Sequence, residues 1–126
     1  MIYAMNTTTA QPTVATPATN GMTVVAEPMN GYKMDYVHMK KAAMILRAVN
    51  HKLRQQMIKL LDENKKMTVT DIYVKLRLEQ SVASQHLAIL RRAGIVSTER
   101  DGKFIYYGVN YNRINEVNAF VEDLVK

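Results

Sequence analysis

The sequence contains no cysteine and no tryptophan. Without cysteine there can be no disulfide bond, thiolate metal site, cysteine nucleophile or thiol redox switch. With only two phenylalanines, the hydrophobic core has to be built mainly from leucine, isoleucine, valine and methionine. The 126 residues, about half of them hydrophobic, suffice for one domain with a single core and not for two.

Long hydrophobic runs are also missing. No stretch approaches the roughly 18 apolar residues that a membrane-spanning helix needs. The N-terminus lacks the basic start and the hydrophobic stretch of a signal peptide. We therefore expect a cytoplasmic protein with no membrane association.

Positive charge is absent from the first 32 residues, where Glu27 is the only charged side chain. The remaining residues carry all 17 basic side chains and ten of the 11 acidic ones, a surplus of seven positive charges. A small basic domain suggests a polyanionic partner, although a basic soluble surface explains the charge alone equally well.

The sequence of residues 1–31 is typical of a flexible tail. Threonine, alanine and proline dominate residues 7–21, which show neither a helical nor a strand period. Such a segment buries too little hydrophobic surface to offset its ordering entropy. We expect a flexible low-complexity tail over residues 1–31 and one domain over residues 32–126.

From residue 32 onward the pattern becomes regular. Apolar residues recur near a 3.6-residue period, which predicts helices. Two β-prone runs flank Asp101-Gly102, a strong hairpin signal. The expected helices cover residues 32–49, 51–64, 71–76, 80–93 and 112–125, with strands at 95–100 and 103–109. We expect Thr70 to cap the third helix, with Ile72, Val74 and Leu76 as its apolar residues.

This order of elements predicts a winged helix-turn-helix, a mostly α fold with a β-hairpin wing. The third and fourth helices are joined by about three residues, as a helix-turn-helix requires. Projection at 100° per residue divides the fourth helix into two faces. One face is apolar, and the other carries Gln80, Ser81, Ser84, Gln85, Ala88, Arg91 and Arg92.

The polar face has the chemistry of a DNA-reading helix. Glutamine can pair bidentately with adenine, and serine can bond to bases or phosphates. Arg91 and Arg92 lie where they could meet backbone phosphates, and Arg100 and Lys103 at the hairpin could do the same. A solvated helix face and a charged soluble turn are the plainer alternatives. His86 falls on the apolar side, which favours a core or interface histidine over a phosphate contact.

Several motifs follow one another in order and with matching spacing. They are Asn50–Leu61 (NHKLRQQMIKLL), Asp71-Ile72, Leu76 and Leu78, Gln80–Leu87 (QSVASQHL), Leu90–Val96 (LRRAGIV) and Arg100–Gly108 (RDGKFIYYG). Together they resemble the ArsR/SmtB family of bacterial repressors over about 75 to 90 residues. Glu79 departs from the serine that usually caps the reading helix in that family.

The resemblance implies ligand sites that this sequence does not fill. Metal-sensing members carry Cys-Val-Cys-Asp where this chain has Thr68-Val69-Thr70-Asp71. Other members use Asp and His pairs on the last helix, which has no histidine here. Glu116, Glu122 and Asp123 read as a solvated acidic face. We therefore expect neither a metal or thiol sensor at the family's known positions nor a cofactor.

The resemblance also implies a homodimer formed by the first and last helices. The apolar residues expected at that interface are Met34, Val37, Ile45, Val117, Val121 and Leu124. A two-fold dimer would present two reading helices to a palindromic operator. The sequence thus predicts a transcriptional repressor that binds double-stranded DNA at specific sequences.

A winged-helix module that binds another protein instead of DNA is the alternative. An enzyme is not expected, since no triad, paired-carboxylate or phosphate-loop arrangement is present, and His38, His51 and His86 lack metal-ligand spacing. The signal or effector cannot be read from the sequence.

Overall fold

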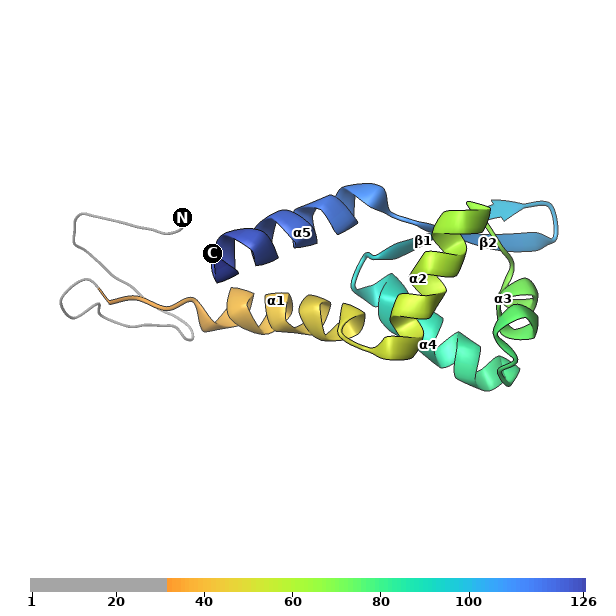
Figure 1. The fold of residues 1–126 in the computed structure, drawn as a ribbon, viewed down its shortest axis with the longest axis horizontal. Helices are drawn as coiled ribbons and strands as arrows, with labels where there is room; N and C mark the ends of the chain where they lie inside the picture. The colour runs from red at the N-terminus through yellow and green to blue at the C-terminus, as the bar shows by residue number, and fades with distance from the viewer. Residues whose placement is uncertain (1–31) are drawn as a thin grey trace. The chain divides into compact units, whose positions relative to one another are not determined.

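The computed structural model describes residues 32–126, so the predicted tail lies outside the described residues. The described residues form five helices and one antiparallel hairpin (Figure 1). The elements are α1 (Tyr36–Val49), α2 (Lys52–Asn64), α3 (Val69–Leu76), α4 (Gln80–Arg92), β1 (Val96–Asp101), β2 (Phe104–Val109) and α5 (Tyr111–Val125). This order confirms the predicted winged helix-turn-helix. No helix within residues 32–126 is long and apolar enough to cross a membrane.

Side-chain caps set where the first helices begin. The backbone N–H of His38 donates to Asp35 Oδ1 at 3.1 Å, which explains why α1 begins at Tyr36, four residues later than predicted. At α2, His51 Nδ1 accepts a hydrogen bond from the N–H of Leu53. The helix therefore begins one residue after His51.

The predicted cap of α3 was wrong. The hydroxyl of Thr68, not of Thr70, accepts a hydrogen bond from the N–H of Asp71, and Asp71 accepts in return from the N–H of Thr68. This reciprocal capping box starts the helix at Val69, two residues earlier than expected. The prediction failed because both threonines precede an acid, and only the three-residue spacing satisfies both donors.

The hairpin is shifted by one residue from the prediction. Asp101 pairs with Phe104, so the two-residue loop is Gly102-Lys103 rather than Asp101-Gly102. Gly102 has φ +66°, which suits the first loop position of a II′-like turn. At its base the hairpin gains a third partner, because Met67 and Tyr107 exchange two backbone hydrogen bonds of 3.0 and 2.7 Å.

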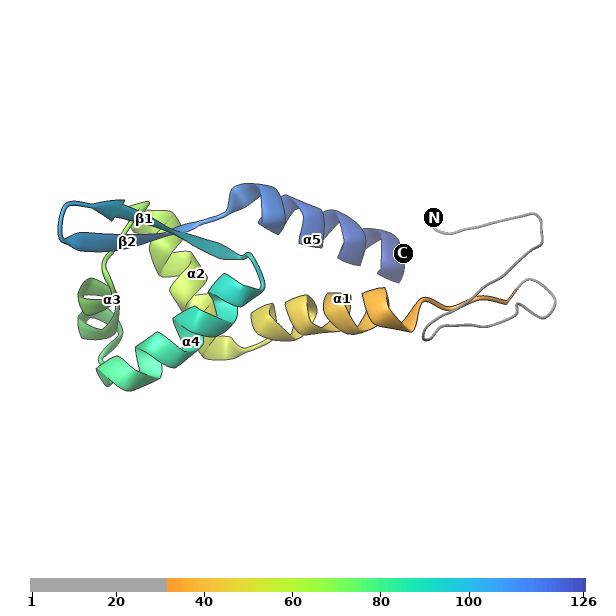
Figure 2. The same ribbon diagram turned by 180° about the vertical axis from the view of Figure 1, so that it is seen from behind.

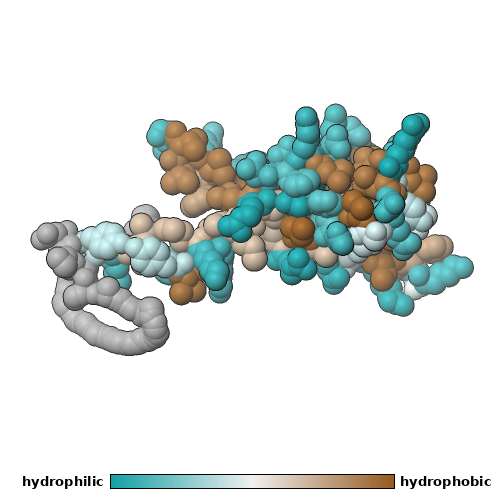
Figure 3. Space-filling view, turned by 90° about the horizontal axis from the view of Figure 1, so that it is seen from below, coloured by the Kyte–Doolittle hydropathy of each residue, from teal (hydrophilic) through white to brown (hydrophobic). Residues whose placement is uncertain are grey.

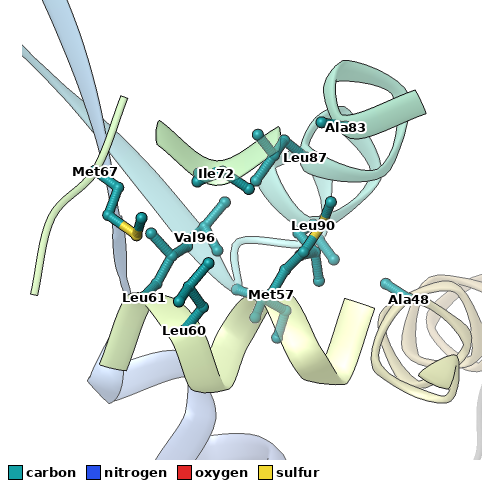
Figure 4. Close-up of a cluster of buried hydrophobic side chains, with 12 residues drawn as sticks. Ala48, Met57, Leu60, Leu61, Met67, Ile72, Ala83, Leu87, Leu90 and Val96 are labelled. Carbon is teal, nitrogen blue, oxygen red and sulfur yellow. The ribbon is translucent and has the colours of Figure 1, made fainter. Parts of the chain in front are cut away.

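The hydrophobic core lies where α2, α3, α4 and β1 meet. Met57 and Leu61 from α2 converge with Leu87 and Leu90 from α4, and all four side chains are fully buried (Figure 4). Figure 2 shows α4 crossing in front of α2. Val74, one of the three apolar residues named for α3, is 64% exposed. The helix is only two turns long, so Ile72 alone takes the fully buried position.

Candidate nucleic-acid interface

The two predicted faces of α4 are present in the structure. Ala83, Leu87 and Leu90 are fully buried, and they fix the helix to the core. We call the opposite, solvent-exposed side the polar face of α4; it comprises Gln80, Ser81, Ser84, Gln85, Ala88, Arg91 and Arg92. The glutamine and serine side chains of this face therefore do not pack on the core.

Tight turns position α4 at both ends. Before it, Arg77 adopts a left-handed conformation with φ 57°, and the N–H of Leu78 donates to the carbonyl of Tyr73. After it, Gly94 has φ +77°, and the side-chain amide of Asn110 donates to the Gly94 carbonyl at 3.0 Å. A side chain at Gly94 would be strained and would meet Arg113 Nε at 3.0 Å.

One buried contact inside this region was missed by the sequence analysis. Arg54 is only 8% exposed, and its Nε donates to the carbonyl of Ala48 at 2.6 Å. Its Nη2 donates to the carbonyl of Arg47, and its Nη1 lies 3.1 Å from Nδ1 of His86. The signal was present, since Arg54 precedes Met57 and Leu61 at helical spacing on the buried side of α2.

His86 is thus a half-buried structural residue rather than a free cation. Its ring centroid lies 4.9 Å from that of His51. Burial, followed by the nearby His51 and Arg54, lowers the pKa of His86 below its usual range. The sequence-based preference for a core or interface role agrees with this environment.

The hairpin has two chemically different faces, because directly paired residues of an antiparallel ladder share a face. The inner face contains Val96, Tyr107 and Val109, which pack on the core, and it continues outward to Arg100 paired with Ile105. The outer face pairs Asp101 with Phe104 and Glu99 with Tyr106. Of the two hairpin cations that were predicted to contact DNA, Arg100 therefore lies on the inner face.

Two lysines lie over aromatic rings of the outer face. Lys103, in the turn, places Nζ 5.5 Å from the ring centroid of Phe104. Lys66 places Nζ 5.0 Å from the ring centroid of Tyr106. These cation–π contacts hold positive charge beside the wing without burying it.

The threonines at the position where the resemblance implies a sensor have structural roles or face solvent. Thr68 caps α3, and Thr70 is exposed. Within residues 32–126, no three His, Cys, Asp or Glu side chains gather closely enough to hold a metal ion. Glu116, Glu122 and Asp123 are exposed on α5.

The predicted dimer residues divide into two groups. Ile45 and Val117 are half-buried against the core, whereas Met34, Val37, Val121 and Leu124 are exposed. Leu124 is 66% exposed, and none of the residues of α5 is buried. Figure 3 shows hydrophobic side chains open to solvent on the face that it displays.

The base of α5 is tied to the rest of the fold. The hydroxyl of Tyr111 donates to Asp62 Oδ1 at 2.6 Å, and this hydrogen bond raises the pKa of Tyr111. Asn110 caps the helix by accepting from the N–H of Arg113. These bonds fix the start of α5 while its C-terminal turns stay exposed.

A helix-turn-helix with an attached β-wing and an exposed, small, polar face on its second helix defines a winged-helix transcription regulator. Residues 51–98 match the family described as "Bacterial regulatory protein, arsR family". An HTH-type regulator of Methanocaldococcus jannaschii is 36% identical over 85 residues, which cover 68% of this chain and 96% of that protein. The chain belongs to the ArsR family, as its motifs predicted.

Two further relatives carry functional names. The transcriptional activator HlyU of Vibrio cholerae is 35% identical over 75% of this chain and 83% of its own, and the transcriptional repressor PagR of Bacillus anthracis is 32% identical over 75% and 88%. A solved HlyU structure from V. cholerae has a TM-score of 0.53 over 69% of this chain and 90% of its own. The PagR structure has a TM-score of 0.55 over 71% and 99%. The chain is therefore a DNA-binding transcriptional regulator, in a family of regulators rather than enzymes.

Proposed function

We propose that this regulator is a repressor that binds a palindromic operator as a homodimer. The observation that carries the proposal is the polar face of α4, where Gln80, Ser81, Ser84 and Gln85 are exposed at the start and middle of the helix. These side chains match the donor and acceptor pattern of base edges in the major groove. Arg91, Arg92, Arg100 and Lys103 would neutralise phosphates on either side.

The homodimer would use the exposed apolar residues of α1 and α5. An exposed leucine, valine and phenylalanine on one helix are costly in water and gain most when a partner covers them. Leu124, Val121 and Phe120 are 66%, 37% and 47% exposed. Met34, just before α1, and Val37, in its first turn, offer similar surface, and Ile45 and Val117 would back the interface from the core side.

The same geometry is compatible with repression, and two of the named relatives favour it. A dimer that occupies two neighbouring half-sites blocks a promoter without any further contact. PagR and SdpR of Bacillus subtilis, both named as transcriptional repressors, are 32% and 33% identical to this chain, and HlyU is named as an activator. We propose that neither a metal nor a thiol controls this regulator, because Thr68 is engaged in capping and the sequence has no cysteine.

The test is fluorescence anisotropy with the DNA upstream of the regulator's own gene, compared with scrambled DNA of the same length. The titration is repeated at several salt concentrations and with and without a chelator. We expect specific, strongly salt-dependent binding that ignores the chelator, and decreased transcription from the bound promoter in vitro. Increased transcription would contradict the repressor role. Binding that fails in chelator would contradict the absence of a metal sensor.

A further inference from the structure

Two adjacent hydrophobic residues near the wing tip are both exposed to solvent. Phe104 is 48% exposed and Ile105 is 45% exposed. Because they are consecutive in β2, they point to opposite sides of the hairpin. Their surroundings differ accordingly, so the two residues can be compared directly.

Ile105 lies on the inner face, the side of the hairpin that is turned toward the helices. Its face is fixed by register, since Ile105 pairs with Arg100, and two steps along the ladder Tyr107 pairs with Thr98 and packs on the core. At the tip the core has ended, so Arg100 and Ile105 both reach solvent. A guanidinium and a branched apolar side chain therefore stand together on the side of the wing that faces the helix-turn-helix.

Phe104 lies on the outer face in the company of carboxylates. Its direct partner is Asp101, and the next pair on that face is Glu99 with Tyr106. The two carboxylates repel a phosphate backbone and offset the charges of Lys66 and Lys103 over the rings, so the outer face carries no surplus of positive charge. Only the inner face of the wing combines a cation with exposed apolar surface and without an acid among its cross-strand pairs.

We propose that Ile105 is a DNA contact of the wing, in which its side chain packs on the deoxyribose wall of the minor groove while Arg100 beside it neutralises a phosphate. This inference rests on the proposed function and adds to it a residue outside the recognition helix and the charged set. Proteins that enter the minor groove frequently place apolar side chains there, isoleucine among them. Phe104, despite equal exposure, is not a DNA contact.

The test compares Ile105→Ala with Phe104→Ala, which remove exposed apolar surface from neighbouring positions on opposite faces. The probe is a duplex selected by the wild-type protein from random-sequence DNA, and anisotropy is measured over a range of salt concentrations. We expect Ile105→Ala to weaken specific binding about fivefold, the effect of uncovering part of one apolar side chain, with the salt slope unchanged. Phe104→Ala should stay within about twofold of wild type, because it keeps the charge of Lys103 above that position and removes only apolar surface that no DNA covers.

A charge variant completes the comparison. Arg100→Ala should weaken binding and lower the salt slope by about one, which separates a phosphate contact from an apolar one. Ile105→Thr keeps the β-branched shape that a strand favours while removing apolar surface, so its affinity loss should follow that of Ile105→Ala even if the alanine variant folds poorly. Circular dichroism confirms that each variant is folded.

The outcomes separate this inference from the proposed function. If the wild-type protein selects and binds DNA but the two Ile105 variants bind as well as it does, Ile105 is not a contact and the proposed function stands. A larger loss in Phe104→Ala than in Ile105→Ala would reverse the assignment of the two faces and overturn the inference. If the wild-type protein selects no DNA, both fail.

Discussion

Nη1 of Arg54 lies 3.1 Å from Nδ1 of His86, and this contact joins the first turns of α2 to the middle of α4. A guanidinium can only donate, so Nδ1 has to accept, and the imidazole carries its proton on Nε2 and is neutral. Protonation would place a second donor and a second positive charge against Arg54. The buried side of α4 is therefore held by a histidine in its neutral form.

This arrangement predicts that acid weakens the fold. The pKa of His86 is lowered in the folded protein by burial, His51 and Arg54, so between that pKa and the unfolded value of about 6.5 the unfolded chain binds more protons. The free energy of unfolding should be level above about pH 6.5 and fall as the pH drops below it. Urea unfolding at a series of pH values from neutral to mildly acidic measures the change.

The matched variants are His86→Gln and His38→Gln. Glutamine can accept from Arg54 without titrating, so His86→Gln should lose part of the decrease between neutral and acidic pH. His38 is an exposed histidine on α1 that pairs with Asp35 and not with Arg54. His38→Gln should therefore retain the part of the stability decrease that His86→Gln removes. An identical pH profile for wild type and His86→Gln would refute this role of His86.

Removal of the Arg54 side chain should destabilise the protein. Arg54→Ala leaves the carbonyls of Ala48 and Arg47 and the Nδ1 of His86 without their donor, and we expect a loss of about 2–3 kcal/mol. Arg54→Lys should recover little of it, since an ammonium cannot reproduce the planar fork. Arg92→Ala, at an exposed position, is the control and should change the stability by less than about 0.5 kcal/mol.

The capping box at α3 gives a sharp contrast between two threonines. Thr68→Ala removes the hydroxyl that accepts from Asp71 and should cost about 1 kcal/mol in chemical denaturation. Thr70→Ala changes an exposed residue inside the helix and should be neutral or slightly stabilising, because alanine has the higher helix propensity. The opposite order would mean that the helix begins where the sequence pattern predicted.

Base reading and charge can be separated by mutation. Gln85→Ala should weaken specific binding by about 1–3 kcal/mol and leave binding to scrambled DNA nearly unchanged, as expected for a bidentate base contact. Lys103→Ala should weaken both and flatten the salt dependence. Anisotropy with the selected duplex and its scrambled control measures both quantities. Equal losses on the two duplexes in Gln85→Ala would place that residue on the phosphates instead.

The proposed dimer can be tested with a pair of charge insertions on α5. Leu124→Glu puts a carboxylate into the exposed apolar surface and should shift the protein toward monomer and weaken operator binding. Asn115→Glu adds the same charge at an exposed position about two and a half turns earlier in α5, on the opposite side of the helix, and should leave both unchanged. Sedimentation equilibrium provides the oligomeric state. A dimer that survives Leu124→Glu would place the interface elsewhere.

The order of elements could be predicted from the sequence because each signal was local. The periodic apolar positions located the helices, Gly94 ended α4, and the Asp-Gly dipeptide located the hairpin to within one residue. Both faces of α4 followed from helical projection alone. The predicted helix starts that were wrong, at α1 and α3, depended on which polar side chain accepts a hydrogen bond from a backbone N–H.

Features that depend on tertiary contact escaped prediction. Arg54 on an apolar stripe gave no indication of its acceptors, which lie in the segment before α2 and on α4. The inner and outer faces of the wing became assignable only with the strand register, because a one-residue shift exchanges every side chain between faces. The exposure of Val74 likewise reflects the limited surface that a two-turn helix can bury.

The buried and the exposed residues of α4 are different residues, and this affects how the DNA specificity of such a regulator can change during evolution. Ala83, Leu87 and Leu90 anchor the helix and are closed to solvent, whereas Ser84, Gln85 and Ala88 are exposed and do no anchoring. Substitutions on the exposed side are therefore nearly neutral for folding, and under the proposed function a new operator can be acquired without passing through unstable intermediates. The exposed face of α4 can therefore change its sequence while the buried face, and with it the fold, stays constant.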